Sequence, residues 1–223
     1  MNIFDTFRES LPYLVDGFQV TLLAWIVSII IGVLLGLVAC LMRLSKIAPL
    51  RGIGWVYIWL IRGTPMIVQA FVVYFGFSQA LGLRMSPLTA GIITLSLNCG
   101  AYLAEIFRSG IQAVPKGQEE AARSLGMGKA RTMMRIVLPQ AFKVAVPPMV
   151  NQFIITLKDT SILTVIGMPE IVNEAQQYIM IHLDYFETYI CVALFYLVVI
   201  SLLMLLSNYI EKKIGYDRKG RQA

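Results

Sequence analysis

The chain has 223 residues, of which 57% are hydrophobic and only 14% charged, and its mean hydropathy is +0.71. This composition excludes an ordinary soluble globular protein and fits one membrane domain covering residues 1–223. The net charge of +6 does not indicate a nucleic-acid partner, because the basic residues collect in particular loops between apolar runs. Three cysteines lie far apart in apolar sequence, and the single histidine, His182, is expected in a polar loop. Neither a metal site nor a catalytic cluster is predicted.

Long apolar runs with few charges predict an all-α protein with five membrane-spanning helices, each near the 20 residues that cross about 30 Å of hydrocarbon. The expected spans are residues 17–42, 62–80, 87–107, 144–167 and 187–210. The first run is too long, and the segment before it too acidic, for a cleaved signal peptide, so we expect a retained helix.

Several side chains mark how these spans should pack. In the first, Gly32 and Gly36 have the spacing that lets another helix approach closely. Trp55, Tyr57 and Trp59 precede the second span and predict an interfacial belt or an amphipathic helix on the cytoplasmic face.

The basic residues predict the orientation of the chain in the membrane. Most of the 19 Lys and Arg lie in the 43–51 loop, in or beside the 112–140 loop, and in the tail after residue 210. The opposite 167–187 loop is acidic. The positive-inside rule therefore places the N-terminus outside and the C-terminus in the cytoplasm, as an odd number of spans requires. The same positive charge should attract anionic membrane lipid.

The longest polar interval, residues 117–139, predicts two short helices separated by a glycine break. Acidic residues follow Gly117, where a helix N-terminus favours negative charge. Gly126 stands where a residue of left-handed conformation would end the first helix. The second helix is expected from about residue 129 to 137, with Pro139 closing it. Such a pair between membrane spans favours docking onto another protein.

This interval resembles the "EAA" loop of permease subunits of bacterial ABC importers. The residues that match, at the spacing of that loop, are Glu120, Ala121, Ala122, Gly126, Ile136, Leu138 and Pro139. Other segments resemble the branch of that family for polar amino acids (histidine, glutamate, glutamine, arginine, cystine). They are Arg62-Gly63-Thr64-Pro65 with Gln69, the series Asn98, Ala101, Tyr102, Glu105 and Arg108, and Lys158-Asp159-Thr160-Ser161.

The resemblance implies a MetI-like type I permease fold in the bacterial cytoplasmic (inner) membrane. It implies a cytoplasmic ABC ATPase dimer that receives the loop at about residues 112–140 and binds the ATP, so that this chain needs no cofactor and is not itself an enzyme. A second permease chain, identical or different, and an extracytoplasmic solute-binding protein are the other expected partners. The substrate would be an amino acid that crosses by alternating access.

The residues themselves indicate a polar path through the membrane. Ionisable groups are costly in lipid, so Arg62, Glu105, Lys158 and Asp159 should face the interior of the bundle. Helical spacing aligns Arg62 with Gln69, Glu105 with Asn98 and Tyr102, Lys158 with Asn151, and Asp159 with Gln152. Three stripes could converge at the centre, where Lys158 and an acidic partner would bind the two charges of an amino acid.

Structural interpretations of these groups remain open. Glu105 could form an ion pair with Arg62 or with Arg108, and Lys158 and Asp159 could neutralise each other. Pro147-Pro148 and the 62–65 segment should break or kink their helices.

A different class of function also remains open, a stand-alone ion-coupled secondary transporter or channel with Asp159 or Glu105 as a relay. That alternative predicts inverted internal repeats, which the sequence does not show, and it leaves the EAA pattern unexplained. No phosphate-binding loop is present, because Gly128-Lys129 is followed by Ala130.

Overall fold

The computed structural model describes residues 3–82 and 84–213, which form helices and short connections without a β-strand among them. The elements in chain order are α1 (Ile3–Leu44), α2 (Ala48–Arg62), α3 (Met66–Phe71), the π-helix η1 (Val72–Phe77), α4 (Ser78–Leu81), α5 (Pro87–Gln112), α6 (Lys116–Ser124), α7 (Lys129–Thr132), the π-helix η2 (Met133–Val137), α8 (Leu138–Asp159), the 3₁₀-helix η3 (Thr160–Ile166), α9 (Ile171–His182) and α10 (Tyr185–Lys213).

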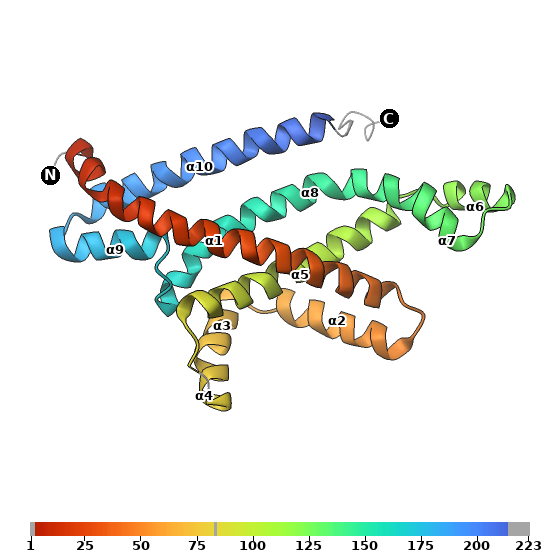
Figure 1. Cartoon of the computed structure of the whole chain (residues 1–223), viewed down its shortest axis with the longest axis horizontal. Helices are drawn as coiled ribbons and strands as arrows, with labels where there is room; N and C mark the ends of the chain where they lie inside the picture. The colour runs from red at the N-terminus through yellow and green to blue at the C-terminus, as the bar shows by residue number, and fades with distance from the viewer. Residues whose placement is uncertain (1–2, 83, 214–223) are drawn as a thin grey trace.

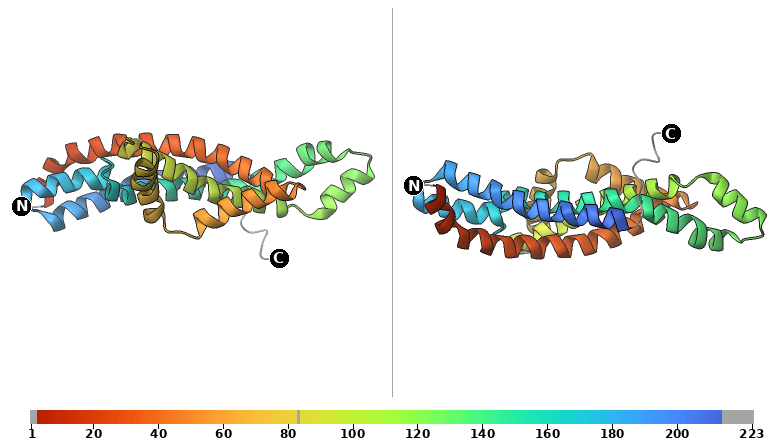
Figure 2. Two further views of the ribbon diagram at one scale, coloured as in Figure 1. Left: turned by 90° about the horizontal axis from the view of Figure 1, so that it is seen from below. Right: turned by 90° about the horizontal axis from the view of Figure 1, so that it is seen from above.

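The helices form an elongated bundle (Figures 1 and 2). Helices α1, α5, α8 and α10 run along the long axis, and the α6–α7 pair projects beyond one end (Figure 1). The turn between α1 and α2 and the last residues of α10 lie towards that same end. The first two basic segments of the sequence, and Lys212 and Lys213 of the third, therefore gather at one end of the molecule. Arg218, Lys219 and Arg221 of the basic tail lie outside the described residues.

Three of the described helices, α1, α5 and α10, are long and apolar enough to cross a membrane, and α2 with α3–α4 makes a fourth crossing if that bent pair is one span. The predicted 144–167 span is α8 followed by η3, so it changes from α to 3₁₀ geometry after Asp159. The hydroxyls of Thr160 and Ser161 donate to the carbonyls of Leu157 and Lys158, both at 2.7 Å, which binds carbonyls at the end of α8. The fifth crossing stays a prediction.

Helices α1 and α5 pack closely through glycines, which confirms the interpretation of Gly32 and Gly36. A Cβ atom on Gly32 would lie 3.1 Å from the Cβ of Cys99, and one on Gly36 only 2.8 Å from the Cβ of Leu103. Helix α2 joins the same pair, because the Tyr57 hydroxyl donates to the Leu97 carbonyl at 2.7 Å. Tyr57 therefore binds α5 instead of belonging to an interfacial belt.

The prediction of a loop over residues 167–187 is wrong, because most of this segment is helix α9. Ile171, Ala175 and Tyr178 form its buried face and pack against the first half of α1. Glu170, which is fully buried, accepts the amide hydrogens of Val172 at 3.0 Å and Asn173 at 2.8 Å and so caps the helix. His182 ends α9 and stacks on the Tyr178 ring, with centroids 4.2 Å apart.

The prolines act differently from expectation in two places. Pro139 does not end the second helix of the polar interval, because it lies in the first turn of α8, where the missing amide hydrogen matters least. The π-helix η2 leads directly into that turn. Pro147 and Pro148 both lie inside the continuous α8. The break at Gly63–Pro65 is confirmed, since α2 and α3–α4 meet there at 107°.

The close approach of α1 and α5 predicts that Gly36→Val destabilises the fold. The new side chain meets Leu103 and the carbonyl of Gly100, which are not flexible chain ends, so the helices must separate at a cost of about 1–3 kcal/mol. Gly52→Val is the matched control, because Gly52 lies on α2 and a Cβ atom there would have no neighbour within 4 Å. Thermal unfolding of the detergent-solubilised protein should show a lower midpoint for Gly36→Val alone. Equal midpoints for both variants would contradict the packing described here.

Candidate functional site

The residues of the EAA pattern form a helical hairpin that projects from the bundle, made of α6, α7 and η2 (Figure 1). Gly126 has φ +82° and ends α6, as predicted. The Met127 amide donates to the Ala122 carbonyl at 3.1 Å, and the Gly126 amide to the Arg123 carbonyl at 2.9 Å. These two bonds are a Schellman motif, which fixes the direction in which the chain leaves α6.

One side of the hairpin is buried and the other is exposed. Ala122 and Val137 are buried where α6 and η2 face each other, whereas Glu120 and Ala121 are exposed. Ile136 and Leu138 are half-buried and Pro139 is exposed. The apolar side chains of Leu125 and Met134 are 85% and 65% exposed on an otherwise polar hairpin. Exposed apolar residues on a projecting, rigidly turned unit favour contact with a partner protein.

The bend between α2 and α3 is held by Gln69, which is buried. Its Nε2 donates to the carbonyls of Ile61 at 2.7 Å and Thr64 at 3.0 Å, carbonyls that the broken helix leaves without intrahelical partners. Its Oε1 accepts from Nδ2 of Asn98 on α5 at 3.2 Å. Both polar ends of the Gln69 amide are therefore engaged within the chain, and Asn98 is bound to the same group.

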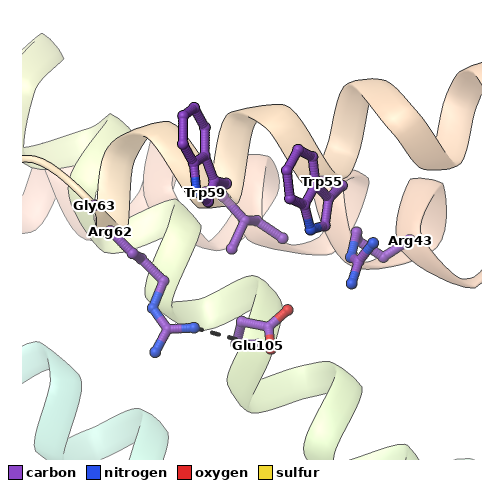
Figure 3. Close-up of a pocket in the computed structure, with 7 residues that line it drawn as sticks. Arg43, Trp55, Trp59, Arg62, Gly63 and Glu105 are labelled. Atoms are coloured by element: carbon purple, nitrogen blue, oxygen red, sulfur yellow. Dashed lines mark ion pairs between the residues drawn. The ribbon is translucent and has the colours of Figure 1, made fainter.

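Arg62, at the end of α2, faces the other polar residues of α5. Its guanidinium lies 5.1 Å from the centre of the Tyr102 ring and 3.9 Å from Oε2 of Glu105 (Figure 3). Glu105 is bound more closely by Arg108, whose Nε and Nη2 donate to its two oxygens at 3.1 and 2.5 Å. Both predicted ion pairs of Glu105 thus exist, and the Arg108 pair, which is bidentate, is the stronger.

The third predicted stripe does not join the first two. Lys158 and Asp159 line a hollow of about 390 Å³ between the end of α8, α9 and α10, together with Ser161, Val172 and Tyr196. Among the described residues no ion pair joins Lys158 to Asp159. Gln152 is buried, and Asn151 lines a separate hollow with Ser207 and Asn208 of α10. The two charges therefore face α10, not the Arg62–Glu105 pair.

Tyr196 was not found by sequence reasoning. It is one tyrosine within a long apolar run, and only the fold shows that it lines the Lys158–Asp159 hollow and donates to Glu170 at 3.4 Å. Trp55 and Trp59 were expected at the membrane surface, and they also line a hollow beside Arg62. Within the part of the chain that the structure describes, no group of His, Cys, Asp and Glu could hold a metal ion.

Known proteins resemble this chain along nearly its whole length. The arginine transport system permease protein ArtQ of Bacillus subtilis (strain 168) is 38% identical over 96% of this chain and 98% of its own. The L-cystine transport system permease protein TcyB of the same organism is 40% identical over 94% and 90%. The glutamine transport system permease protein GlnP of Escherichia coli (strain K12) is 34% identical over 92% and 94%.

Solved structures agree in fold. A chain of the crystal structure of an amino acid ABC transporter with histidines has a TM-score of 0.91 and 38% identity, covering 96% of this chain and 99% of that one. A chain of the inward-facing MetNI methionine ABC transporter has a TM-score of 0.75 at 19% identity, covering 91% and 96%, and shows the fold alone. Residues 28–216 match the family described as binding-protein-dependent transport system inner membrane component. The chain belongs to this family, that of the permease subunits of ABC importers, and its relatives are amino-acid permeases.

Proposed function

We propose that this chain is the permease subunit through which a polar amino acid enters the cytoplasm by alternating access, driven by a separate ABC ATPase dimer. The observation that carries the proposal is the hairpin of α6, α7 and η2. It presents Glu120 and Ala121 on an exposed surface, fixes its turn at Gly126, and projects beyond the end of the bundle. A hairpin so placed can dock in a groove of an ATPase and receive its movement.

The hollow beside Lys158 and Asp159 supports an amino acid as the substrate. It offers a cation for the carboxylate and an anion for the ammonium group, with the hydroxyls of Ser161 and Tyr196 among its lining residues. The relatives named for arginine, cystine and glutamine share those two groups in their substrates and differ in the side chain. We therefore assign substrate contact to Lys158 and Asp159, and a supporting role in the path to Gln152, whereas Arg62 and Glu105 lie outside this hollow.

The distribution of charge supports the orientation. The α1–α2 turn, the projecting hairpin and the end of α10 carry most of the basic residues and lie at one end, which we place in the cytoplasm of a bacterial inner membrane. The N-terminus and α9 then lie at the outer end, where an extracytoplasmic binding protein would deliver the substrate. A second permease chain completes the pair that two ATPase subunits require.

The proposal is tested by purifying the tagged chain from native membranes in mild detergent and identifying the proteins that accompany it by mass spectrometry. We expect an ABC ATPase subunit, together with any second permease. Uptake of radiolabelled arginine, glutamine and cystine into proteoliposomes should then require ATP and the binding protein. A chain that purifies alone and moves an amino acid without ATP would overturn the proposal and favour the ion-coupled transporter.

Replacing Gly126 by valine should uncouple ATP hydrolysis from transport. A β-branched side chain strains a φ of +82°, at a cost of about 1–3 kcal/mol, so the hairpin turn opens while the membrane helices stay intact. Gly128→Val is the control, because Gly128 has φ −64° and lies next to the same turn in open space. We expect Gly126→Val to abolish most ATP-driven uptake. Normal uptake by this variant would count against docking through the hairpin.

Asp159→Asn should weaken substrate transport by removing the anion that faces the substrate ammonium group. Loss of one charged contact of about 1.5–3 kcal/mol corresponds to a rise in KM of roughly tenfold to a hundredfold. Glu174→Gln on α9 is the control, because it removes one negative charge outside the hollow. KM and the maximal rate of uptake are measured in the same proteoliposomes. An unchanged KM for Asp159→Asn would remove Asp159 from the substrate path.

A further inference from the structure

A second hollow of about 350 Å³ lies between the end of α1, the second half of α2 and α5 (Figure 3). It is lined by Arg43 from α1, by Trp55, Ile58, Trp59, Arg62 and Gly63 at the end of α2, and by Glu105 from α5. Figure 3 shows Trp55 and Trp59 side by side on α2, with Arg43 and Arg62 at opposite ends of the row. This hollow is separate from the one beside Lys158 and Asp159.

Positive charge exceeds negative charge in and beside this hollow. The Glu105 carboxylate is the acidic group on its lining, and Arg108 already binds both of its oxygens. Arg62 lies 3.9 Å from Glu105 and is 43% exposed, so it is only loosely paired. The Nε of Arg43 is buried and meets no hydrogen-bond acceptor within residues 3–82 and 84–213. Two guanidinium groups therefore face the hollow with donors that an external anion could bind.

The two indoles favour an opening of this hollow at a membrane surface. Trp55 and Trp59 stack with centroids 5.7 Å apart and planes 10° apart, and they are 49% and 61% exposed. Indoles favour the boundary between lipid headgroups and hydrocarbon. The exposed apolar side chains of Ile53, Val56 and Leu60 lie on a neighbouring face of α2, about 100° around the helix from the two indoles, where acyl chains could lie.

The position along the bundle selects the kind of anion. Arg43 places one end of the hollow beside the α1–α2 turn; Lys46 lies in this turn and Arg51 at the start of α2, at the basic end of the molecule. Basic pockets between helices on the cytoplasmic side of a membrane are suited to anionic headgroups, which are abundant in that leaflet. A phosphodiester would accept hydrogen bonds from the guanidinium groups of Arg43 and Arg62, and its acyl chains would remain in the bilayer beside α2.

We propose that the hollow formed by Arg43, Trp55, Trp59 and Arg62 binds the phosphodiester headgroup of an anionic phospholipid. Arg43 and Arg62 are the ligands, because both side chains line the hollow while Arg108 already binds the Glu105 carboxylate, and the stacked indoles would lie at the level of the glycerol backbone. The bound lipid fixes the turn between α1 and α2 and thereby the start of the bent span. This assignment does not depend on which amino acid is carried or on how the hairpin docks.

The test is native mass spectrometry of the purified complex after incubation with equal parts of phosphatidylglycerol and phosphatidylcholine. We expect the wild-type complex to retain phosphatidylglycerol in preference to phosphatidylcholine. Arg43→Gln and Lys46→Gln are compared, because each removes one positive charge near the same turn, so that general attraction to anionic lipid falls equally. Only Arg43→Gln also removes a ligand of the proposed lipid site. Its retention of phosphatidylglycerol should therefore be at least about fivefold lower than that of Lys46→Gln, the factor that corresponds to one basic contact at a membrane surface.

A second variant distinguishes loss of the lipid site from misfolding of Arg43→Gln. Trp55→Leu changes an exposed position and should also lower phosphatidylglycerol retention without altering the size-exclusion profile of the complex. Equal losses in Arg43→Gln and Lys46→Gln would reduce the effect to general surface attraction and overturn the proposal. Equal retention of both lipids would overturn it too. A change in the number of permease chains per complex, with lipid retention unchanged, would assign the hollow to contact with a second copy instead.

Discussion

The bend after Arg62 leaves backbone carbonyls that other parts of this fold have to bind. A helix broken within an apolar bundle leaves carbonyls that neither water nor lipid can bind, and each would be costly if left alone. Gln69 meets this requirement by binding the carbonyls of Ile61 and Thr64, and its own oxygen is bound by Asn98 of α5. One side chain thus connects α2, α3 and α5. Because α2 is held there, Arg62 reaches Tyr102 and Glu105, and the row of Trp55 and Trp59 faces the hollow at the base of α1.

Some helices of the bundle are packed more tightly than others, and the hollow beside Lys158 lies between a tightly packed and a lightly packed helix. Glycines let α1 and α5 meet almost backbone to backbone, as at Gly36 and Gly100. By contrast, α10 buries only Thr188, Cys191, Val192 and Ser207 among its described residues. The hollow is bounded on one side by α8, which packs on α5, and on the other by this lightly packed helix. Segments with few buried contacts are those that open at least cost, so α10 can move relative to α8 without disturbing the α1–α5 contact.

Features set by local chemistry could be predicted from the sequence, and those set by tertiary packing could not. Gly126 and the break at Gly63–Pro65 follow from what a residue permits its own backbone to do, and the glycine pair of α1 was recognised because a residue without a side chain marks a contact whatever the partner helix is. Helix α9 was missed because its polar residues outweigh the Ile171, Ala175 and Tyr178 face, and the cap by Glu170 was not recognised. Helical spacing aligned Lys158 with Asn151 and Asp159 with Gln152 on α8. It could not show that Lys158 and Asp159 face α10, because spacing defines a face and not the neighbour that the face meets.

The prediction that Pro139 ends a helix was wrong, and this matters for how movement can pass from the hairpin to the membrane helices. With a break at Pro139, the hairpin and the membrane helix would be separate bodies joined by a flexible connection. Instead α7, η2 and α8 follow one another from Lys129 to Asp159 without an interruption, a length of roughly 45 Å at the α-helical rise. On the proposed function, a displacement of the hairpin by an ATPase acts directly on the helix that carries Lys158 and Asp159. Pro147 and Pro148 each remove one amide donor from the interior of α8 and make this helix easier to bend than an ordinary one, so it can both transmit movement and change shape at defined positions. On the same proposal, movement of the ATPase reaches the membrane helices through a single continuous element.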